Sequence, residues 1–259
     1  MEQVIVFATH FLNEEIINRY LKIKHECSDR FSVILFFYTK NMEGGNAFIK
    51  CLDVGDIMIV NPSNIRELGY FSLFKNSIRG SVNHLLQYYY LKNPKYDYYW
   101  LVEYDVVFTG LWSYFFNILS RYSADFIGGH VEHYNIDNSS WTWWNKTRWV
   151  SIPFLLNELI KSFNPIFRLS SKALRYLDSY LRMGNIAHYE VLIPTALYHA
   201  GFSLMDYGGT GLFTPIDLKN KLYIQGHGIN NGTLRWRPIF LKEEVLLLNT
   251  KNVVFHPVK

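Results

Sequence analysis

The sequence has 259 residues, of which 49% are hydrophobic and 19% are charged, and this balance excludes a disordered chain. The net charge is +4 without a dense run of Lys or Arg, so strong nucleic-acid binding is not indicated and no nucleic-acid partner is expected. Two cysteines, Cys27 and Cys51, exclude a disulfide framework and favour a reducing compartment. Aromatic residues reach 17%, which suits a sugar-binding cleft. An AT-rich genome that favours Phe and Tyr codons explains this frequency equally well.

Short β-rich runs alternate with amphipathic segments over the first 130 residues. The predicted strands cover 3–8, 31–38, 56–60, 98–102 and 125–129, and the predicted helices cover 14–26, 80–91 and 111–122. The run at 31–38 is continuously apolar, which is typical of a strand buried on both faces of a parallel sheet. This alternation predicts an open, largely parallel α/β sheet.

The pattern changes after residue 130. Residues 130–150 are rich in Trp, Asn and His and are predicted to form a long loop, a feature that is often functional. Further helices are predicted at 154–162, 171–182 and 190–200, and strands at 167–170, 202–207 and 253–257. No repeat or linker interrupts the sequence, so we expect one domain over residues 1–259.

Membrane and export signals are missing from the sequence. No apolar run reaches the roughly 18 to 20 residues that span a bilayer. The first residues read as a buried strand and lack the charged start and long apolar stretch of a signal peptide. A cytoplasmic location is therefore expected.

Two acidic residues follow the predicted strand at 98–102. Glu103 and Asp105 are two residues apart, so in an extended chain their carboxylates point the same way and could share one cation. Ligands of open α/β sheets bind beyond the carboxyl ends of the strands. Oxygen ligands suit Mg²⁺ or Mn²⁺, which could hold a diphosphate there. The alternative is a pair of surface acids that bind Arg or Lys side chains.

The segment from Asp97 to Val106, with Thr109-Gly110 behind it, resembles the acidic-motif region of GT-A type glycosyltransferases, which use nucleotide sugars. It also resembles a bacterial and fungal group of transferase-like proteins with Trp-x-x-Glu-x-Asp followed by Thr-Gly. The resemblance covers the spacing of elements over residues 1–130 and the later His-Pro pair, although Glu103 replaces the more usual first Asp. It implies a GT-A-like (Rossmann-like) open, mostly parallel central sheet flanked by helices. Residues 1–130 would form the nucleotide-sugar-binding half, and 131–259 the acceptor-binding half.

The resemblance also implies residues that bind the donor. Thr9 and His10 end the first strand, where the family holds the nucleotide base and ribose, and Tyr104 lies between the two acids. Lys75 and Arg79 are four residues apart and are expected to share a helix face. Arg79 is the better phosphate ligand on geometry. An incidental His in a loop and a solvated basic face are the alternatives.

Two further residues complete the implied site. His256 resembles the histidine that completes the metal site in several GT-A enzymes, where a neutral imidazole joins two carboxylates. Glu190 precedes a predicted helix, where many inverting enzymes of this type keep the base that takes the acceptor's proton. Helix capping is the alternative role for Glu190. Glu132 and Asp137 are the next candidates for the base.

Two loops are candidates for substrate contact. Residues 225–232 are Gly-rich but lack the Gly-Lys-Ser/Thr of a P-loop, and are predicted to close over the donor as a mobile loop. The loop at 130–150 holds four tryptophans that could form an acceptor platform, a core cluster or a membrane-facing patch. These are Trp141, Trp143, Trp144 and Trp149.

Together these residues imply an inverting glycosyltransferase assisted by Mn²⁺ or Mg²⁺, with a UDP-sugar as the first choice of donor. By analogy, the acceptor would be a glycan or lipid-linked glycan in bacterial surface polysaccharide synthesis. Mild positive charge suits peripheral association with the inner face of the plasma membrane. A non-catalytic carbohydrate- or nucleotide-sugar-binding protein on the same fold is the alternative. A nucleotidyltransferase is disfavoured, because the loop at 9–13 has neither Gly nor Arg.

Overall fold

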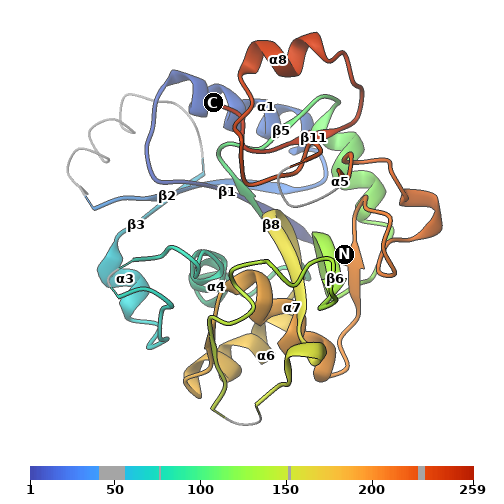
Figure 1. Ribbon diagram of the computed structural model, residues 1–259. Helices are drawn as coiled ribbons and strands as arrows, with labels where there is room; N and C mark the ends of the chain where they lie inside the picture. Colours follow the sequence, from blue (N-terminus) through green and yellow to red (C-terminus); the bar gives the residue numbers. More distant parts are fainter. Residues whose placement is uncertain (41–55, 76, 151–152, 227–230) are drawn as a thin grey trace.

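The computed structural model describes residues 1–40, 56–75, 77–150, 153–226 and 231–259. A seven-stranded sheet forms the centre of the molecule, in the order β10-β6-β8-β4-β1-β2-β3 (Figure 1). Its strands are β1 (Gln3–Thr9), β2 (Ser32–Tyr38), β3 (Ile57–Val60), β4 (Tyr98–Glu103), β6 (Phe126–His133), β8 (Ile160–Ser170) and β10 (Leu204–Asp206). Two smaller pairs join β5 (Val107–Phe108) to β11 (Val254–Phe255) and β7 (Thr147–Arg148) to β9 (Ile186–Ala187).

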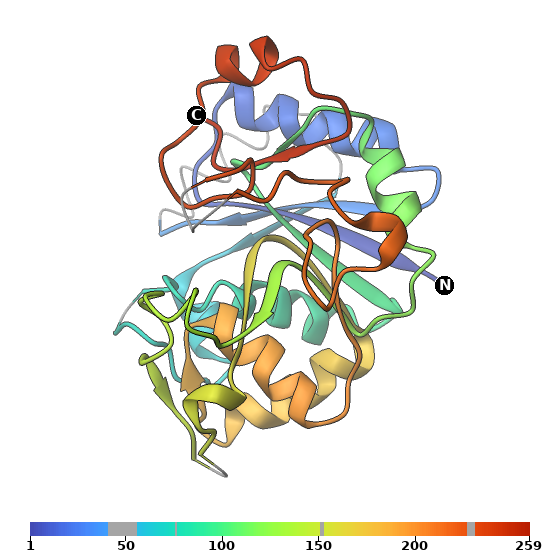
Figure 2. The same cartoon turned by 45° about the vertical axis from the view of Figure 1, so that its right-hand side comes forward.

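Helices cover both faces of this sheet. They are α1 (Glu14–Cys27), α3 (Pro62–Arg66), α4 (Asn83–Lys92), α5 (Trp112–Leu119), α6 (Ser171–Arg182), α7 (Tyr189–His199) and α8 (Lys242–Leu247). Figure 2 shows α1 and α5 above the sheet and α4, α6 and α7 below it. No helix in the described part of the chain is both long and apolar enough to cross a bilayer.

The interior strand β1 explains why two separate cores form. All seven of its residues are buried. Side chains alternate across a strand, so Val4 and Val6 join the core under α4, α6 and α7, while Ile5 and Phe7 join the core under α1 and α5. β1 pairs in parallel with β2 on one side and β4 on the other. The predicted open, mostly parallel sheet flanked by helices is confirmed, with β8 running antiparallel between β4 and β6.

Side-chain caps start two of the helices. Asn13 accepts a hydrogen bond from the N–H of Ile16 at 2.9 Å and starts α1. Ser170 accepts one from the N–H of Ala173 at 3.1 Å and starts α6. Each side chain satisfies a backbone donor that the first turn leaves unpaired.

Three local predictions are wrong. The predicted helix at 154–162 is a short turn, Leu156–Glu158, followed by β8, because pairing with β6 overrides the helix-like apolar spacing. The predicted loop at 130–150 is interrupted at both ends, since β6 continues to His133 and β7 pairs with β9. Lys75 and Arg79 share no helix face: α4 begins only at Asn83, and both residues lie in turns around a bridge between Phe74 and Ser77.

Candidate active site

The carboxyl end of β4 is crossed by the segment that contains β11. β4 ends at Glu103, opposite Ala8 of β1. The chain then turns, and the carbonyl of Asp105 accepts a hydrogen bond from the N–H of Val258 at 2.9 Å. Pairing of β5 with β11 fixes the same segment from the other side. Residues about 150 positions apart in sequence therefore meet at this edge of the sheet.

Glu103, Asp105 and His256 converge at this edge. One ligand atom from each lies within 4.8 Å of the other two. His256 Nε2 is 3.5 Å from Asp105 Oδ1 and 4.0 Å from Glu103 Oε2. His256 Nδ1 lies 2.9 Å from the carbonyl oxygen of Arg235 and must carry a proton, because a carbonyl only accepts. Nε2 is therefore the nitrogen that faces the carboxylates, as in histidines that bind metals.

Asp105 has a carboxylate oxygen that suits a cation. Its Oδ1 is buried and accepts no hydrogen bond among the described residues. A buried carboxylate oxygen without a hydrogen-bond partner is costly, and a divalent cation would satisfy it. Two carboxylates and one imidazole form a donor set that binds Mn²⁺ or Mg²⁺. The residues present thus fit a divalent metal.

The two carboxyl groups have opposite pKa shifts. Burial raises the pKa of Glu103, and the neighbouring Asp105 raises it further. Burial also opposes ionisation of Asp105, but His256 and Lys259 outweigh it and lower its pKa to about 2. Like charges this close cannot both ionise at no cost, so a bound cation would stabilise the doubly ionised pair.

Lys259 is a functional candidate that sequence reasoning missed. Its Nζ donates hydrogen bonds to Asp105 Oδ2 at 3.1 Å and to the hydroxyl of Tyr104 at 2.9 Å. It also lies 4.7 Å from the centre of the Tyr104 ring. The only signal in the sequence is a cation three residues after His256, and that spacing has no special meaning until the fold is known.

Three aromatic rings form a cluster that includes Tyr104, the ring beside the Lys259 ammonium group. The rings of His10, Phe11 and Tyr104 lie edge to face, with centroids 4.9–5.1 Å apart. Burial and Lys259 lower the pKa of His10, although Asp105 opposes this shift. His10 is exposed and neutral at pH 7, so it could stack against a base. The structure thus places His10 and Tyr104 beside the acidic pair.

Thr9 has a local role in the turn after β1. Its hydroxyl donates to the carbonyl of Phe11 at 2.6 Å and accepts from the N–H of the same residue at 3.3 Å. The residue is 3% exposed. Both hydrogen bonds serve the loop that presents His10, so donor contact by Thr9 remains a prediction.

Lys75 and Arg79 lie on the exposed loop before α4. Lys75 projects from a turn. The guanidinium of Arg79 lies 5.7 Å from the centre of the Phe74 ring. Burial lowers the pKa of His188 to about 3, and the charge of Arg79 contributes to this shift. Arg79 therefore lies on the side of the site that contains Glu190.

Glu190 lies behind Glu103 at the start of α7. Its Oε1 accepts a hydrogen bond from the N–H of Asn164 at 3.0 Å, and its Oε2 lies 3.4 Å from His188 Nδ1. Burial raises the pKa of Glu190 to about 8. The neighbouring Tyr189 donates from its hydroxyl to Glu103 Oε1 at 3.4 Å. Glu190, a carboxyl group with a raised pKa, is therefore adjacent in sequence to Tyr189, which contacts Glu103.

The other two candidates for the base have different surroundings. Glu132 is ion-paired with Lys161 at 3.1 Å and accepts a hydrogen bond from Gln225 at 3.1 Å. Burial opposes its ionisation, but Lys161 outweighs this and lowers the pKa of Glu132. Asp137 is exposed in the following turn. Glu132 therefore lacks the raised pKa that a general base near neutral pH requires.

Two of the four tryptophans remain candidates for acceptor contact. Trp143 stacks on His188 with ring centroids 4.2 Å apart and planes 13° apart. Trp141 lies 5.8 Å from the ammonium group of Lys161. Trp144 is 1% exposed and belongs to the core. The other three all pack against that core, but Trp149 contacts Phe154 and Tyr180 instead of His188 or Lys161. Of the Gly-rich loop, 227–230 lie outside the described residues.

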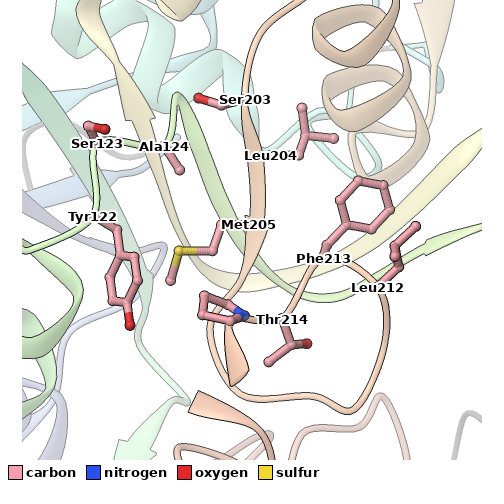
Figure 3. A pocket seen from close by; sticks show the side chains of 10 residues that line it. Tyr122, Ser123, Ala124, Ser203, Leu204, Met205, Leu212, Phe213 and Thr214 are labelled. Atoms are coloured by element: carbon pink, nitrogen blue, oxygen red, sulfur yellow. The ribbon is translucent and has the colours of Figure 1, made fainter. Parts of the chain in front are cut away.

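A separate hollow of roughly 420 Å³ opens at the other end of the sheet. Its lining includes Ser123 and Ser203, which precede β6 and β10. Figure 3 shows Met205, Phe213 and Thr214 around it. These strands run parallel to β4, so the hollow lies at their amino ends and not at the edge that holds the acids.

No protein-family model matches the sequence, and the comparison with curated proteins gives no match. Solved structures similar to this chain include mouse xyloside xylosyltransferase 1, with 12% identity over 81% of this chain and 85% of that chain and a TM-score of 0.45. Galactosyltransferase LgtC has 10% identity over 95% and 78%, with a TM-score of 0.43. A putative glucose-1-phosphate thymidylyltransferase from Bacillus anthracis has 10% identity over 84% and 92%, with a TM-score of 0.45. At such identities and TM-scores, no function passes from these neighbours to this chain.

Proposed function

We propose that this chain is a metal-assisted glycosyltransferase that takes its sugar from a nucleotide-diphosphate sugar. The observation that carries the proposal is the convergence of Glu103, Asp105 and His256 around a buried, unpartnered carboxylate oxygen. Mn²⁺ or Mg²⁺ held by these residues would neutralise charge on the leaving diphosphate. Asp105 is the main ligand, and Glu103 binds closer to the sugar or through water.

The chain's own cations and rings complete the donor site. Lys259 is already held beside Asp105, and it turns its ammonium group to the diphosphate when a donor enters. His10 and Tyr104 lie against the base and ribose. Arg79 approaches the phosphates from the loop before α4. A UDP-sugar is the first donor to test.

Glu190 is the proposed base. Its carboxylate takes the proton from an acceptor hydroxyl as that oxygen forms a bond to the anomeric carbon. The bond from that carbon to the diphosphate breaks, and its electron pair leaves with the diphosphate. A single displacement of this kind inverts the configuration. The raised pKa of Glu190 and the link from Tyr189 to Glu103 support this assignment.

Residues 131–259 supply the acceptor side of the proposed site. Trp141 and Trp143 are half-buried beside Lys161 and His188, where their rings could cover a sugar. We propose a glycan or lipid-linked glycan of surface polysaccharide synthesis as the acceptor, met at the inner face of the plasma membrane.

Two measurements separate an enzyme from a carbohydrate-binding protein on the same fold. Melting of the protein with UDP, GDP and CMP nucleotides, each with and without Mn²⁺, identifies the nucleotide. We expect one nucleotide class to stabilise the protein in a Mn²⁺-dependent way. Release of nucleoside diphosphate from the matching sugar nucleotide then tests catalysis. Stabilisation without release from any sugar nucleotide would favour a non-catalytic protein that binds nucleotide sugars, and no stabilisation by any nucleotide would contradict the enzyme.

Replacing Lys259 by Met tests its role at the diphosphate. A hydrogen bond to a charged group contributes about 1.5–3 kcal/mol, so KM for the donor is expected to rise roughly 10- to 100-fold. Lys146→Met is the matched control, since Lys146 is an exposed lysine in the loop before β7. Steady-state kinetics that show an unchanged KM in Lys259→Met would refute the assignment.

A further inference from the structure

Residues 231–259, here called the C-terminal segment, expose large apolar side chains close together in sequence. Leu246 is 72% exposed and Leu247 is 83% exposed, at the end of α8. Trp236, Leu241 and Leu248 are each exposed by half or more. Exposed apolar side chains that lie together often mark an interaction site, and three consecutive exposed leucines are such a case.

The segment that carries these side chains is anchored by its own small hydrophobic core. Five buried residues of the same segment form a small core of their own, separate from the two cores of the sheet. They are Phe240, Val245, Val253, Phe255 and Val258. Val245 is 5% exposed and ties α8 to this core, while the leucines that follow it project outward. We call Trp236, Leu241 and Leu246–Leu248 the docking face.

The charge of the segment indicates which kind of partner the docking face binds. The C-terminal segment carries five basic and two acidic side chains, so it contributes +3 to the chain's net charge of +4. Arg237, Lys242 and Lys251 are exposed and form no ion pair among the described residues. A tryptophan and leucines flanked by free basic groups complement the acyl boundary and phosphates of an anionic bilayer.

The docking face is tied directly to the candidate metal ligands. The carbonyl of Arg235, the residue before Trp236, lies 2.9 Å from His256 Nδ1, and its N–H donates to the His256 carbonyl at 3.2 Å. The N–H of Phe240 donates to the Pro257 carbonyl at 2.8 Å. Figures 1 and 2 both place α8 and the end of the chain at the same end of the molecule. Contact through this face therefore holds the site close to the bilayer surface.

We infer that the docking face binds the surface of an anionic lipid bilayer. Resting on the proposed glycosyltransferase function, this contact places the site next to an acceptor that is itself anchored in the membrane. The leucines and Trp236 enter the headgroup region, and Arg237, Lys242 and Lys251 bind lipid phosphates. The acceptor class that fits is a lipid-linked glycan.

Co-sedimentation with vesicles tests the inference. The full chain is expected to bind vesicles of phosphatidylcholine with about one-third phosphatidylglycerol, and to bind pure phosphatidylcholine far less. The double variant Arg237→Gln/Lys242→Gln is expected to bind about fivefold less per removed charge. Leu246→Gln/Leu247→Gln is expected to bind at least roughly tenfold less. Leu212→Gln/Ile216→Gln is the control, because Leu212 is 86% and Ile216 89% exposed near β10; it is expected to bind like the wild type.

The outcomes separate this inference from the proposed function. Nucleoside diphosphate release from soluble donor is expected to be unchanged in the Arg237→Gln/Lys242→Gln and Leu246→Gln/Leu247→Gln variants, since none of these residues belongs to the proposed site. Wild-type protein that ignores anionic vesicles, or equal loss in the control variant, overturns the inference. Docking-face variants that turn a dimer into a monomer on size-exclusion chromatography, without lipid binding by either form, would instead show an interface between copies. Vesicle binding by a protein that releases no diphosphate would keep the inference and remove the enzyme.

Discussion

Asp105→Asn is expected to lower nucleoside diphosphate release by roughly three orders of magnitude. The substitution keeps the shape of the side chain but removes a charge from the candidate metal ligands Glu103, Asp105 and His256. Metal-ion catalysis supplies several kcal/mol of transition-state stabilisation, and each 1.36 kcal/mol is a factor of ten in rate. The variant is also expected to lose the rise in Tm that Mn²⁺ gives the wild type, because an amide is a weak ligand for these ions.

Asp178→Asn is the matched control for this experiment. Asp178 is also ion-paired, to Arg182 at 3.0 Å, but it lies on α6 below the sheet. It is expected to keep both the activity and the response to Mn²⁺. Far-ultraviolet circular dichroism establishes that both variants are folded. A folded Asp105→Asn protein with wild-type activity would remove the metal site from the proposed mechanism.

The sheet was predictable because its strands carry their own signal. The runs around β1, β2 and β4 are continuously apolar, since each is buried on both faces, and Asn13 and Ser170 mark helix starts through side-chain chemistry. Only the end of β8 carries such a signal, and the strand predicted at 167–170 lies within it. The first part of β8 buries Lys161, Ser162 and Asn164 among its apolar residues, so neither periodicity nor composition reveals it. Only its two partner strands determine it, and these lie elsewhere in the sequence.

The candidate site was predictable to a similar degree. Glu103 and Asp105 follow a recognisable strand, and the family resemblance indicated His256, so the structure's convergence of the three was expected. Lys259 was not predicted, because its contact with Asp105 depends on how the chain crosses the edge of the sheet. The environment of Glu190 was not predictable either. A helix-start glutamate is usually solvated, and its burial against β8 follows from tertiary packing alone.

Glu190→Gln is expected to lower transfer to an acceptor by roughly 10²- to 10⁴-fold, the usual contribution of a positioned base. The amide keeps the local hydrogen bonds: its oxygen accepts from the N–H of Asn164, and the backbone N–H of residue 190 still donates to His188 Nδ1. The pKa of Glu190 is raised to about 8, so wild-type kcat is expected to rise with pH up to about that value. Glu132→Gln is the comparison, because Glu132 is the next candidate for the base. Loss of activity in Glu132→Gln and not in Glu190→Gln would assign the role of base to Glu132.

The same substitution is expected to stabilise the metal-free protein at alkaline pH. The pKa of Glu190 is about 8 in the fold and near 4.5 in the unfolded chain. A raised carboxyl pKa contributes stability that is fully present below the unfolded value and is lost as pH rises through the folded value. At pH 9 the buried carboxylate therefore costs roughly 3–5 kcal/mol relative to pH 4. Glu190→Gln avoids this cost, so its Tm should exceed that of the wild type by roughly 5–10 °C at pH 9 and by little near pH 5. An inactive variant with a lower Tm than the wild type at pH 9 would contradict this prediction. It would show that the ionised Glu190 carboxylate stabilises the fold, whereas the proposed base destabilises the fold when it is ionised.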